Sequence, residues 1–265
     1  MENVKLVVSD IDGTLIDSHL ECPKRNVEGI DYIRSQGIPF AIATGRPFKM
    51  VEKNLKQWDL ENRCDYFVCN NGATVIDYKT KKEFNQNCLS KETLHMIYDL
   101  FHDLEASICV YEGDTLVTDK ITEAYEYRCK VAHIHKKQVD FKEYVQTDYP
   151  KMLIVSSNEV QKEIIKRFEQ IKPDSYRMFA SSSILTEVVN PNLSKVAGID
   201  VLCKQLHIKR ENVLCFGDEM NDYEMLSHFV GVAMENAVQN VKEVCKFETK
   251  SCDDGGVGEF LLTTL

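Results

Sequence analysis

The sequence predicts an α/β protein, in which a doubly wound parallel sheet carries an inserted α+β domain. Three observations support this fold class. Short apolar runs alternate with amphipathic helices at the start of the chain, the middle mixes short strands with helices, and the first rhythm returns near the end. Since strands that alternate with helices over short loops form a parallel sheet covered on both faces, the two ends are expected to build one core. The core is predicted at residues 1–81 and 188–265, and the insertion at 82–187.

The first third of the chain contains three strand candidates of uniformly apolar residues, at 6–9, 40–44 and 66–69. Such runs are typical of strands buried on both faces. A helix is predicted over residues 26–36, where Gly37 ends it. A second helix is predicted to start at Pro47, and its apolar residues recur every three or four positions: Phe48, Val51, Leu55 and Trp58.

The middle of the chain has a different pattern. Ser90 is a candidate cap for a helix, and a second helix is predicted over 159–171. Strands of this part are predicted at 107–111, 115–118, 151–156, 176–180 and 185–189. The last part is predicted to contain a helix from Ser194 to Leu206, strands at 213–216 and 230–233, and a final helix at 257–262.

Composition excludes several classes of protein. The 265 residues carry 32 basic and 42 acidic side chains, a net charge of −10, which argues against nucleic acid as a partner. Ten cysteines without a Cys-x-x-Cys pair indicate reduced thiols rather than a disulfide scaffold or a zinc site. The first residues resemble neither a signal peptide nor a membrane-spanning helix, so no membrane partner and a cytoplasmic location are expected. The oligomeric state stays open.

The densest chemical signal is Asp10-Ile11-Asp12-Gly13-Thr14-Leu15, directly after the first strand. Ligands of open α/β sheets bind at the carboxyl ends of the strands. Two carboxylates about 4 Å apart repel each other by about 4 kcal/mol at an effective dielectric constant near 20, a cost that a cation or a catalytic task would offset. A solvated turn is the plainer alternative. A calcium loop of the EF-hand type fails, because Leu15 stands where that loop needs glycine.

Three further polar clusters have the same relation to the sheet. Thr44-Gly45-Arg46 follows the second strand, Lys195 opens a helix, and Gly217-Asp218-Glu219-Met220-Asn221-Asp222 follows the strand at 213–216. Each has an ordinary alternative, namely a cap for Thr44, a surface lysine for Lys195 and a turn residue for Asp218. Four such clusters at neighbouring strand ends nevertheless predict one shared site that binds an anion.

These motifs resemble those of the haloacid dehalogenase-like phosphatase superfamily, in particular its Cof-type branch with an inserted α/β cap. The match consists of Asp-x-Asp-Gly-Thr-Leu at 10–15, Thr-Gly-Arg at 44–46, Lys195, and Gly-Asp-x-x-Asn-Asp at 217–222. Asn70-Asn71-Gly72-Ala73 resembles a further segment of this branch, whereas Val196 departs from the glycine that many relatives have. The resemblance implies a Rossmann-like core, a cap that selects the substrate, and Mg²⁺-dependent phosphatase activity.

The residues fit this chemistry. The Asp10 carboxylate can attack a phosphate ester and form an aspartyl-phosphate, while Asp12 protonates the leaving alcohol and later takes a proton from water. Magnesium, a hard cation with oxygen ligands, is the expected cofactor. Its expected ligands are the Asp10 and Asp218 carboxylates and the Asp12 backbone carbonyl, with Asp222 behind them to orient Lys195 or a water molecule.

The transferring phosphoryl group is expected to be surrounded by polar groups from these motifs: Thr44, the N–H groups of Gly45 and Ile11, Lys195 and Asn221. Arg46 and Asn71 are predicted to contact the substrate or the cap. Candidate substrate contacts within the insertion are Tyr111, Glu112, Asp114, Tyr125, Tyr127, Arg128 and His133.

The sequence therefore predicts a Mg²⁺-dependent phosphatase of small phosphorylated metabolites, such as sugar phosphates or related cofactors. Dehalogenation is disfavoured, because a halide leaving group needs no acid at the position of Asp12. A phosphomutase on the same scaffold is a close alternative. A non-catalytic module that binds phosphorylated metabolites is a second alternative, from a different functional class.

Overall fold

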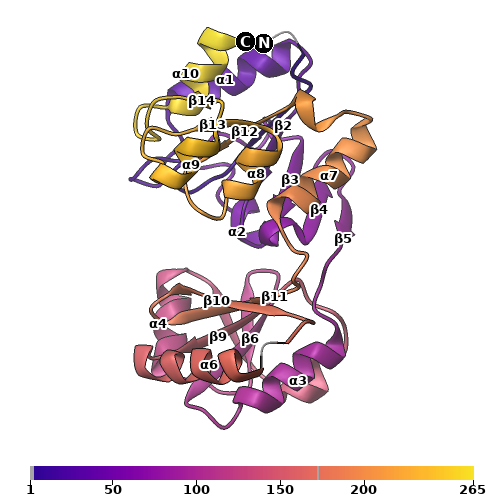
Figure 1. The fold of residues 1–265 in the computed structure, drawn as a ribbon, viewed down its shortest axis with the longest axis vertical. Helices are drawn as coiled ribbons and strands as arrows, with labels where there is room; N and C mark the ends of the chain where they lie inside the picture. Colours follow the sequence, from indigo (N-terminus) through magenta and orange to yellow (C-terminus); the bar gives the residue numbers. More distant parts are fainter. Residues whose placement is uncertain (1–2, 172) are drawn as a thin grey trace. The chain divides into compact units, whose positions relative to one another are not determined.

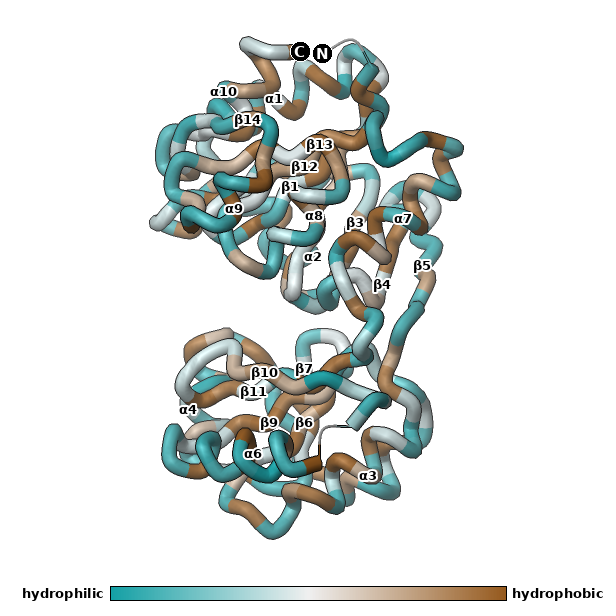
Figure 2. The backbone as a smooth tube through the Cα atoms, viewed as in Figure 1, coloured by the Kyte–Doolittle hydropathy of each residue, from teal (hydrophilic) through white to brown (hydrophobic). Residues whose placement is uncertain are grey.

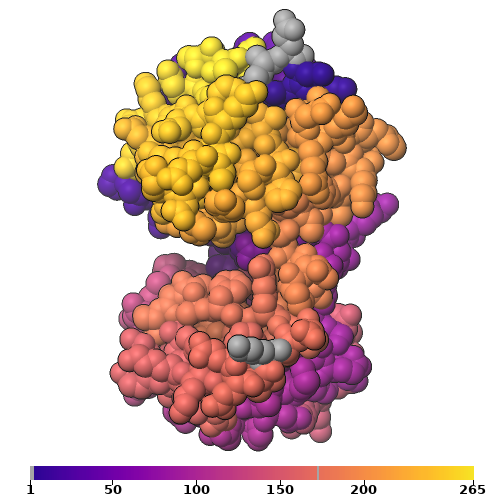
Figure 3. Space-filling model, viewed as in Figure 1, coloured from indigo at the N-terminus to yellow at the C-terminus, as the bar shows by residue number. Residues whose placement is uncertain are grey.

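The computed structural model describes residues 3–171 and 173–265, which form two compact units. Unit 1 contains the chain up to Phe84 together with Ser194–Leu265, and unit 2 is Asn85–Leu193. Figure 3 shows this division on the visible face, where the two ends of the chain share one body and the middle forms the other. The predicted insertion, 82–187, begins three residues before the start of unit 2 and ends six residues before its end. The strand Lys82–Asn85 extends the sheet of unit 1, and hydrogen bonds such as that from Arg177 to the Leu193 carbonyl hold residues before 194 in unit 2.

The sheet of unit 1 has eight strands in the order β14-β13-β12-β1-β2-β3-β4-β5. Their bounds are β1 Leu6–Ser9, β2 Phe40–Ala43, β3 Tyr66–Cys69, β4 Thr74–Asp77, β5 Lys82–Asn85, β12 Val213–Gly217, β13 Val230–Ala233 and β14 Phe247–Glu248. The neighbours from β14 to β3 pair in parallel, which confirms the α/β class. The sheet also has an antiparallel extension that the sequence did not predict, because β4 runs antiparallel to β3.

Helices cover both faces of this sheet (Figure 1). One face packs against α1 (Lys24–Ser35), α2 (Phe48–Glu52) and α10 (Gly256–Thr264), and the other against α7 (Lys195–Leu206), α8 (Tyr223–His228) and α9 (Gln239–Val244). The alternation along β1 explains the two layers, since Val7 enters the first cluster and Leu6 and Val8 enter the second. Figure 2 shows the hydrophobic colouring of β12 and β13 between these layers.

The helix predicted after Pro47 is much shorter than its apolar pattern suggested. It ends at Glu52 and continues as turns, although Leu55 and Trp58 are still buried in the core. Burial of the apolar residues therefore follows the helical spacing even where the backbone does not.

Unit 2 contains a sheet of six strands in the order β10-β11-β9-β6-β7-β8. The strands are β6 Ala106–Glu112, β7 Thr115–Thr118, β8 His135–Gln138, β9 Met152–Ser156, β10 Arg177–Ser182 and β11 Leu185–Val189. The helices are α3 Lys91–Phe101, α4 Glu123–Val131, α5 Phe141–Tyr144 and α6 Asn158–Ile171. Ser90 caps α3 as predicted, because its hydroxyl accepts a hydrogen bond from the Thr93 N–H at 3.2 Å.

Two expectations from composition can be compared with the fold. All ten cysteines are free thiols, and burial raises the pKa of Cys22 to about 12 and that of Cys203 to about 11. Among the residues that the structure describes, no helix is both long and apolar enough to cross a bilayer.

Candidate active site

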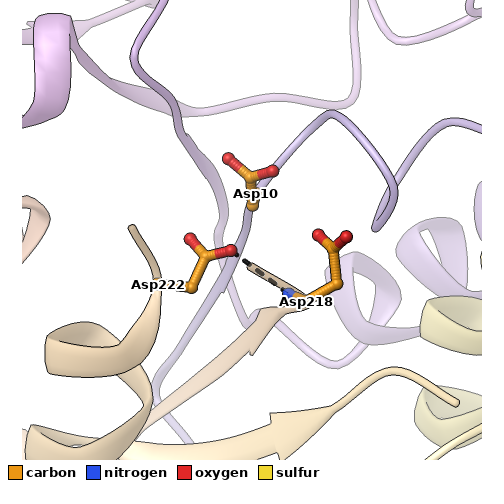
Figure 4. A group of neighbouring side chains, drawn as sticks. All are labelled: Asp10, Asp218 and Asp222. Atoms are coloured by element: carbon orange, nitrogen blue, oxygen red, sulfur yellow. Dashed lines mark hydrogen bonds between the residues drawn. The ribbon is translucent and has the colours of Figure 1, made fainter. Parts of the chain in front are cut away.

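The polar clusters that follow β1, β2 and β12 lie at one edge of the unit 1 sheet, as parallel pairing requires. Asp10 follows β1, Thr44 follows β2 and Asp218 follows β12, while Lys195 is the first residue of α7. The carboxylates of Asp10, Asp218 and Asp222 converge in Figure 4. One oxygen of each carboxylate lies within 4.8 Å of one oxygen of the other two, and all three residues are buried.

Lys195 joins two of these acids. Lys195 is the first residue of α7, which the Ser194 hydroxyl caps by accepting from the Ala197 N–H at 3.2 Å. The Lys195 Nζ lies 2.5 Å from Asp10 Oδ1 and 2.6 Å from Asp222 Oδ1. With a residue exposure of only 2%, Lys195 is an internal counter-charge and not a surface lysine.

The loop after β12 holds Asp218 and Asp222 in different ways. Asp222 Oδ2 accepts from the N–H groups of Asp218 at 3.2 Å and Glu219 at 3.3 Å, the former drawn as a dashed line in Figure 4. Asp218 Oδ1 accepts from the Thr14 hydroxyl at 2.8 Å. Both oxygens of Asp222 already accept hydrogen bonds, one from Lys195 and the other from N–H groups of this loop. Asp222 therefore keeps Lys195 and the loop in position.

Burial dominates the electrostatics of the cluster. It raises the pKa of Asp10 to about 7; the Lys195 ammonium opposes this rise and the Asp222 carboxylate adds to it. Burial also raises the pKa of Asp218 to about 6, against the hydrogen bond from Thr14. Burial alone would lower the pKa of Lys195, yet Asp10 and Asp222 together raise it. Three buried carboxylates with one ammonium leave an excess of negative charge and of oxygen donors, which fits a divalent hard cation.

The loop after β1 is shaped around Asp218. Gly13 has φ +75°, and a Cβ atom there would lie 2.3 Å from Asp218 Oδ2. The Ile11 side chain is fully buried in the core, so only its backbone can face the site. The Asp12 carboxylate is 51% exposed and lies outside the group of three acids, because it is paired with Arg46.

A tight turn after β3 connects the remaining motifs. Asn71, at φ +55°, donates its N–H to the Thr44 carbonyl at 3.0 Å, and a Cβ atom at Gly45 would lie 3.1 Å from Asn71 Oδ1. A Cβ atom at Gly72 would lie 2.1 Å from the Ser194 carbonyl. The turn thus packs against both the Thr44 loop and the start of α7, and the Asn71 side chain lies against Gly45.

Two phosphate-binding candidates differ in their surroundings. Thr44 is buried, and its hydroxyl accepts from the Arg46 N–H at 3.2 Å instead of capping a helix. Asn221 is exposed in the turn between β12 and α8.

Sequence reasoning missed two residues that support the site. One is Thr14, through its bond to Asp218. The other is Asn236, whose side-chain amide donates to the Gly13 carbonyl at 2.8 Å while its carbonyl oxygen accepts from the Cys252 N–H at 2.9 Å. Asn236 lies three residues after the end of β13, on the side of the sheet where Asp218 follows β12, so a search for polar residues after parallel strands could have found it.

Comparison with known protein families gives a match over nearly the whole chain. The family model of haloacid dehalogenase-like hydrolases matches residues 7–261. The chain belongs to the haloacid dehalogenase-like hydrolase family. Its relatives include YxeH, a candidate phosphatase of Bacillus subtilis (strain 168), which is 28% identical over 260 residues covering 96% of this chain and 95% of that protein.

Two further proteins extend the comparison. The 5-amino-6-(5-phospho-D-ribitylamino)uracil phosphatase YitU of B. subtilis (strain 168) is 25% identical, with 97% of this chain and 96% of that protein covered. The crystal structure of a haloacid dehalogenase-like hydrolase from Bacteroides thetaiotaomicron superposes with a TM-score of 0.89 at 26% identity, over 99% of this chain and all of that one. The predicted family, the α/β fold and the class of phosphoric monoester hydrolase are confirmed.

Proposed function

We propose that the protein is a Mg²⁺-dependent phosphatase of small phosphorylated metabolites that works through an aspartyl-phosphate at Asp10. The single observation that carries this proposal is the buried Lys195 bridging Asp10 and Asp222, with Asp218 beside them. An acid at this position is held in place by an internal cation and lies at the edge of the sheet where substrates of α/β proteins bind.

Asp10 serves as the nucleophile in the first step. Its carboxylate oxygen forms a bond to phosphorus while the bond from phosphorus to the leaving oxygen breaks, and Asp12 gives that oxygen a proton. In the second step, water forms a bond to phosphorus, Asp12 takes its proton, and the Asp10–phosphorus bond breaks. Lys195 keeps the Asp10 carboxylate in position throughout.

Polar groups around Asp10 would bind the phosphoryl oxygens. These are the Thr44 hydroxyl, the N–H groups of Gly45 and Ile11, the Lys195 ammonium and the Asn221 amide. Each is fixed by the fold before the substrate arrives, except the exposed Asn221, so little reorganisation is needed when charge develops.

Magnesium would be held by the Asp10 and Asp218 carboxylates and the Asp12 backbone carbonyl. When bound, it would neutralise part of the charge of the phosphoryl group. The raised pKa values of Asp10, about 7, and Asp218, about 6, support a site that is completed by a cation, since burial makes these carboxylates costly to ionise without one.

The substrate class is inferred from the chemistry and from the relatives. A net charge of −10 disfavours nucleic acid, and YitU by its name acts on the phosphate of a ribityl compound. Unit 1 would be the catalytic core and unit 2 the part that selects the organic portion, with sugar phosphates or related cofactors as the expected substrates.

Phosphate release from 4-nitrophenyl phosphate and from a panel of phosphorylated metabolites tests the proposal. Activity is expected with Mg²⁺ and not with EDTA, and Asp10→Asn should abolish it. Asp200→Asn is the matched control, because Asp200 is an acid of α7 that pairs with Arg210 on the surface. Undiminished turnover by Asp10→Asn would refute the nucleophile.

The same panel separates the alternatives. Hexose monophosphates that interconvert without phosphate release, with or without a bisphosphate activator, would identify a phosphomutase. Binding without any turnover in the presence of Mg²⁺ would identify a non-catalytic module.

A further inference from the structure

Arg46 donates hydrogen bonds to the carboxylate of Asp12 from two nitrogens of its guanidinium. Its Nε lies 3.0 Å from Asp12 Oδ2, and its Nη2 contacts Asp12 Oδ1. This is the bidentate arrangement in which a planar guanidinium fixes both the position and the plane of a carboxylate. Asp12 is half exposed, and this contact with Arg46 restrains its side chain.

Arg46 is itself held from two sides. Its backbone N–H donates to the Thr44 hydroxyl at 3.2 Å, and its guanidinium carbon lies 6.0 Å from the centroid of the Trp58 ring. Trp58 is buried and donates its indole N–H to the Leu20 carbonyl at 3.0 Å. The tryptophan therefore connects Arg46 to the same loop, after β1, that carries Asp12.

These contacts use the groups with which Arg46 would bind a substrate. One edge of the guanidinium is occupied by Asp12, and the indole of Trp58 lies beside it. The sequence predicted that Arg46 contacts the substrate or the cap, and within unit 1 its side chain contacts Asp12 and Trp58.

We propose that Arg46 is a positioning residue for Asp12, and that Trp58 holds Arg46 in the orientation this requires. The inference rests on the proposed function, in which Asp12 is the acid and base. An ion pair this accessible to solvent contributes little to stability, so folding gives little reason for such a pair. Orientation does, because a displacement of about 1 Å in a catalytic group can cost about 100-fold in rate.

The test uses phosphate esters of similar size that differ in leaving group: phenyl, 4-nitrophenyl and 2,4-dinitrophenyl phosphate. Phenolate needs a proton on leaving and dinitrophenolate does not. Arg46→Met is therefore expected to lower kcat/KM for phenyl phosphate by about 30- to 100-fold. For the dinitrophenyl ester, the factor by which kcat/KM falls should be at least about ten times smaller. For phenyl phosphate, whose slow step is departure of the phenol, the loss should be in kcat, with KM changed little.

A double-mutant cycle identifies the target of Arg46. In an Asp12→Asn background, Arg46→Met should have no more than about a twofold further effect on phenyl phosphate, because the group it positions is already disabled. Arg46→Lys keeps the charge without the two-point contact and should fall between wild type and Arg46→Met. Trp58→Leu should reproduce the leaving-group dependence of Arg46→Met in weaker form.

Lys49→Gln is the matched control, since it removes a positive charge from α2, where Lys49 pairs with Glu52 at 2.7 Å. It should not alter the dependence on leaving group. Equal losses for all three esters, additive effects in the cycle, or a change confined to KM would each overturn the positioning role. Failure of the wild-type protein to hydrolyse any of the esters would instead refute the proposed function.

Discussion

Replacing Lys195 by methionine tests the buried charge cluster most severely. The variant keeps the approximate length of the side chain but removes the ammonium that lies 2.5 Å from Asp10 and 2.6 Å from Asp222. Both acids are buried, with exposures of 5% and 0%, so water cannot replace the lost cation.

The expected cost is large and depends on pH. Removing one partner of a buried ion pair costs about 3–5 kcal/mol. The pKa of Asp10 is already raised to about 7 by burial, and it should rise further without Lys195, which is the principal group that lowers it. A carboxyl whose pKa is raised in the folded state contributes stability below its unfolded pKa and loses it as pH rises through the folded pKa. The free energy of unfolding of the variant should therefore be about 3–5 kcal/mol below that of the wild type at pH 8.5. At pH 5.5, where Asp10 binds a proton, this difference should be smaller by at least about 1 kcal/mol.

Urea unfolding with EDTA, followed by tryptophan fluorescence, measures this loss. Trp58 is the only tryptophan and belongs to unit 1, so the signal reports the unit that contains the cluster. Adding Asp222→Asn to the variant should restore at least about 1 kcal/mol at pH 8.5, since one uncompensated charge is removed. A loss below about 1 kcal/mol, or equal losses at both pH values, would refute the electrostatic reasoning.

Three other predictions concern the same unit. Gly13→Ala should reduce hydrolysis of 4-nitrophenyl phosphate by about 100-fold or more, because Gly13 has φ +75° and a Cβ atom there would lie 2.3 Å from Asp218 Oδ2. A variant with more than half of wild-type activity would contradict this. Mg²⁺ should raise the Tm more at pH 8 than at pH 5.5, since protons compete for Asp10 and Asp218, whose pKa values are about 7 and about 6; differential scanning fluorimetry giving equal shifts would argue against it. Asn26→Ala should destabilise unit 1 by about 2–3 kcal/mol in the urea experiment. The buried Asn26 amide donates to the Leu15 carbonyl and accepts from the Gly258 N–H, each at 2.8 Å. A change under about 0.5 kcal/mol would be inconsistent with that role.

The elements that were predicted best are short strands whose residue pattern is typical of a buried strand. Five strands have the predicted bounds, namely those at 6–9, 66–69, 115–118, 185–189 and 230–233, because short runs rich in apolar and β-branched residues between turn residues are typical of strands. The other predicted strands shift by no more than two residues, the usual uncertainty at element ends. By contrast, β4 and β5 were not predicted, since their position depends on pairing after the turn at Asn70–Gly72 and β5 is largely exposed.

The same contrast applies to the site. Parallel strands must deliver Asp10, Thr44 and Asp218 to one edge, so their proximity follows from the order of the strands. The pairing of Arg46 with Asp12 depends on the conformations of two loops, which no spacing in the sequence encodes. Burial of Lys195 between two acids likewise required the packing of α7.

The most direct test of the central claim is to trap the covalent intermediate. The Asp12→Asn variant would be mixed with 2,4-dinitrophenyl phosphate and Mg²⁺, quenched in acid, reduced with borohydride and digested for peptide mass spectrometry. The proposed mechanism predicts that the residue at position 10 is converted to homoserine, because borohydride reduces an acyl phosphate and leaves free carboxylates intact. Release of dinitrophenol without modification at Asp10, or modification of a different residue, would contradict it.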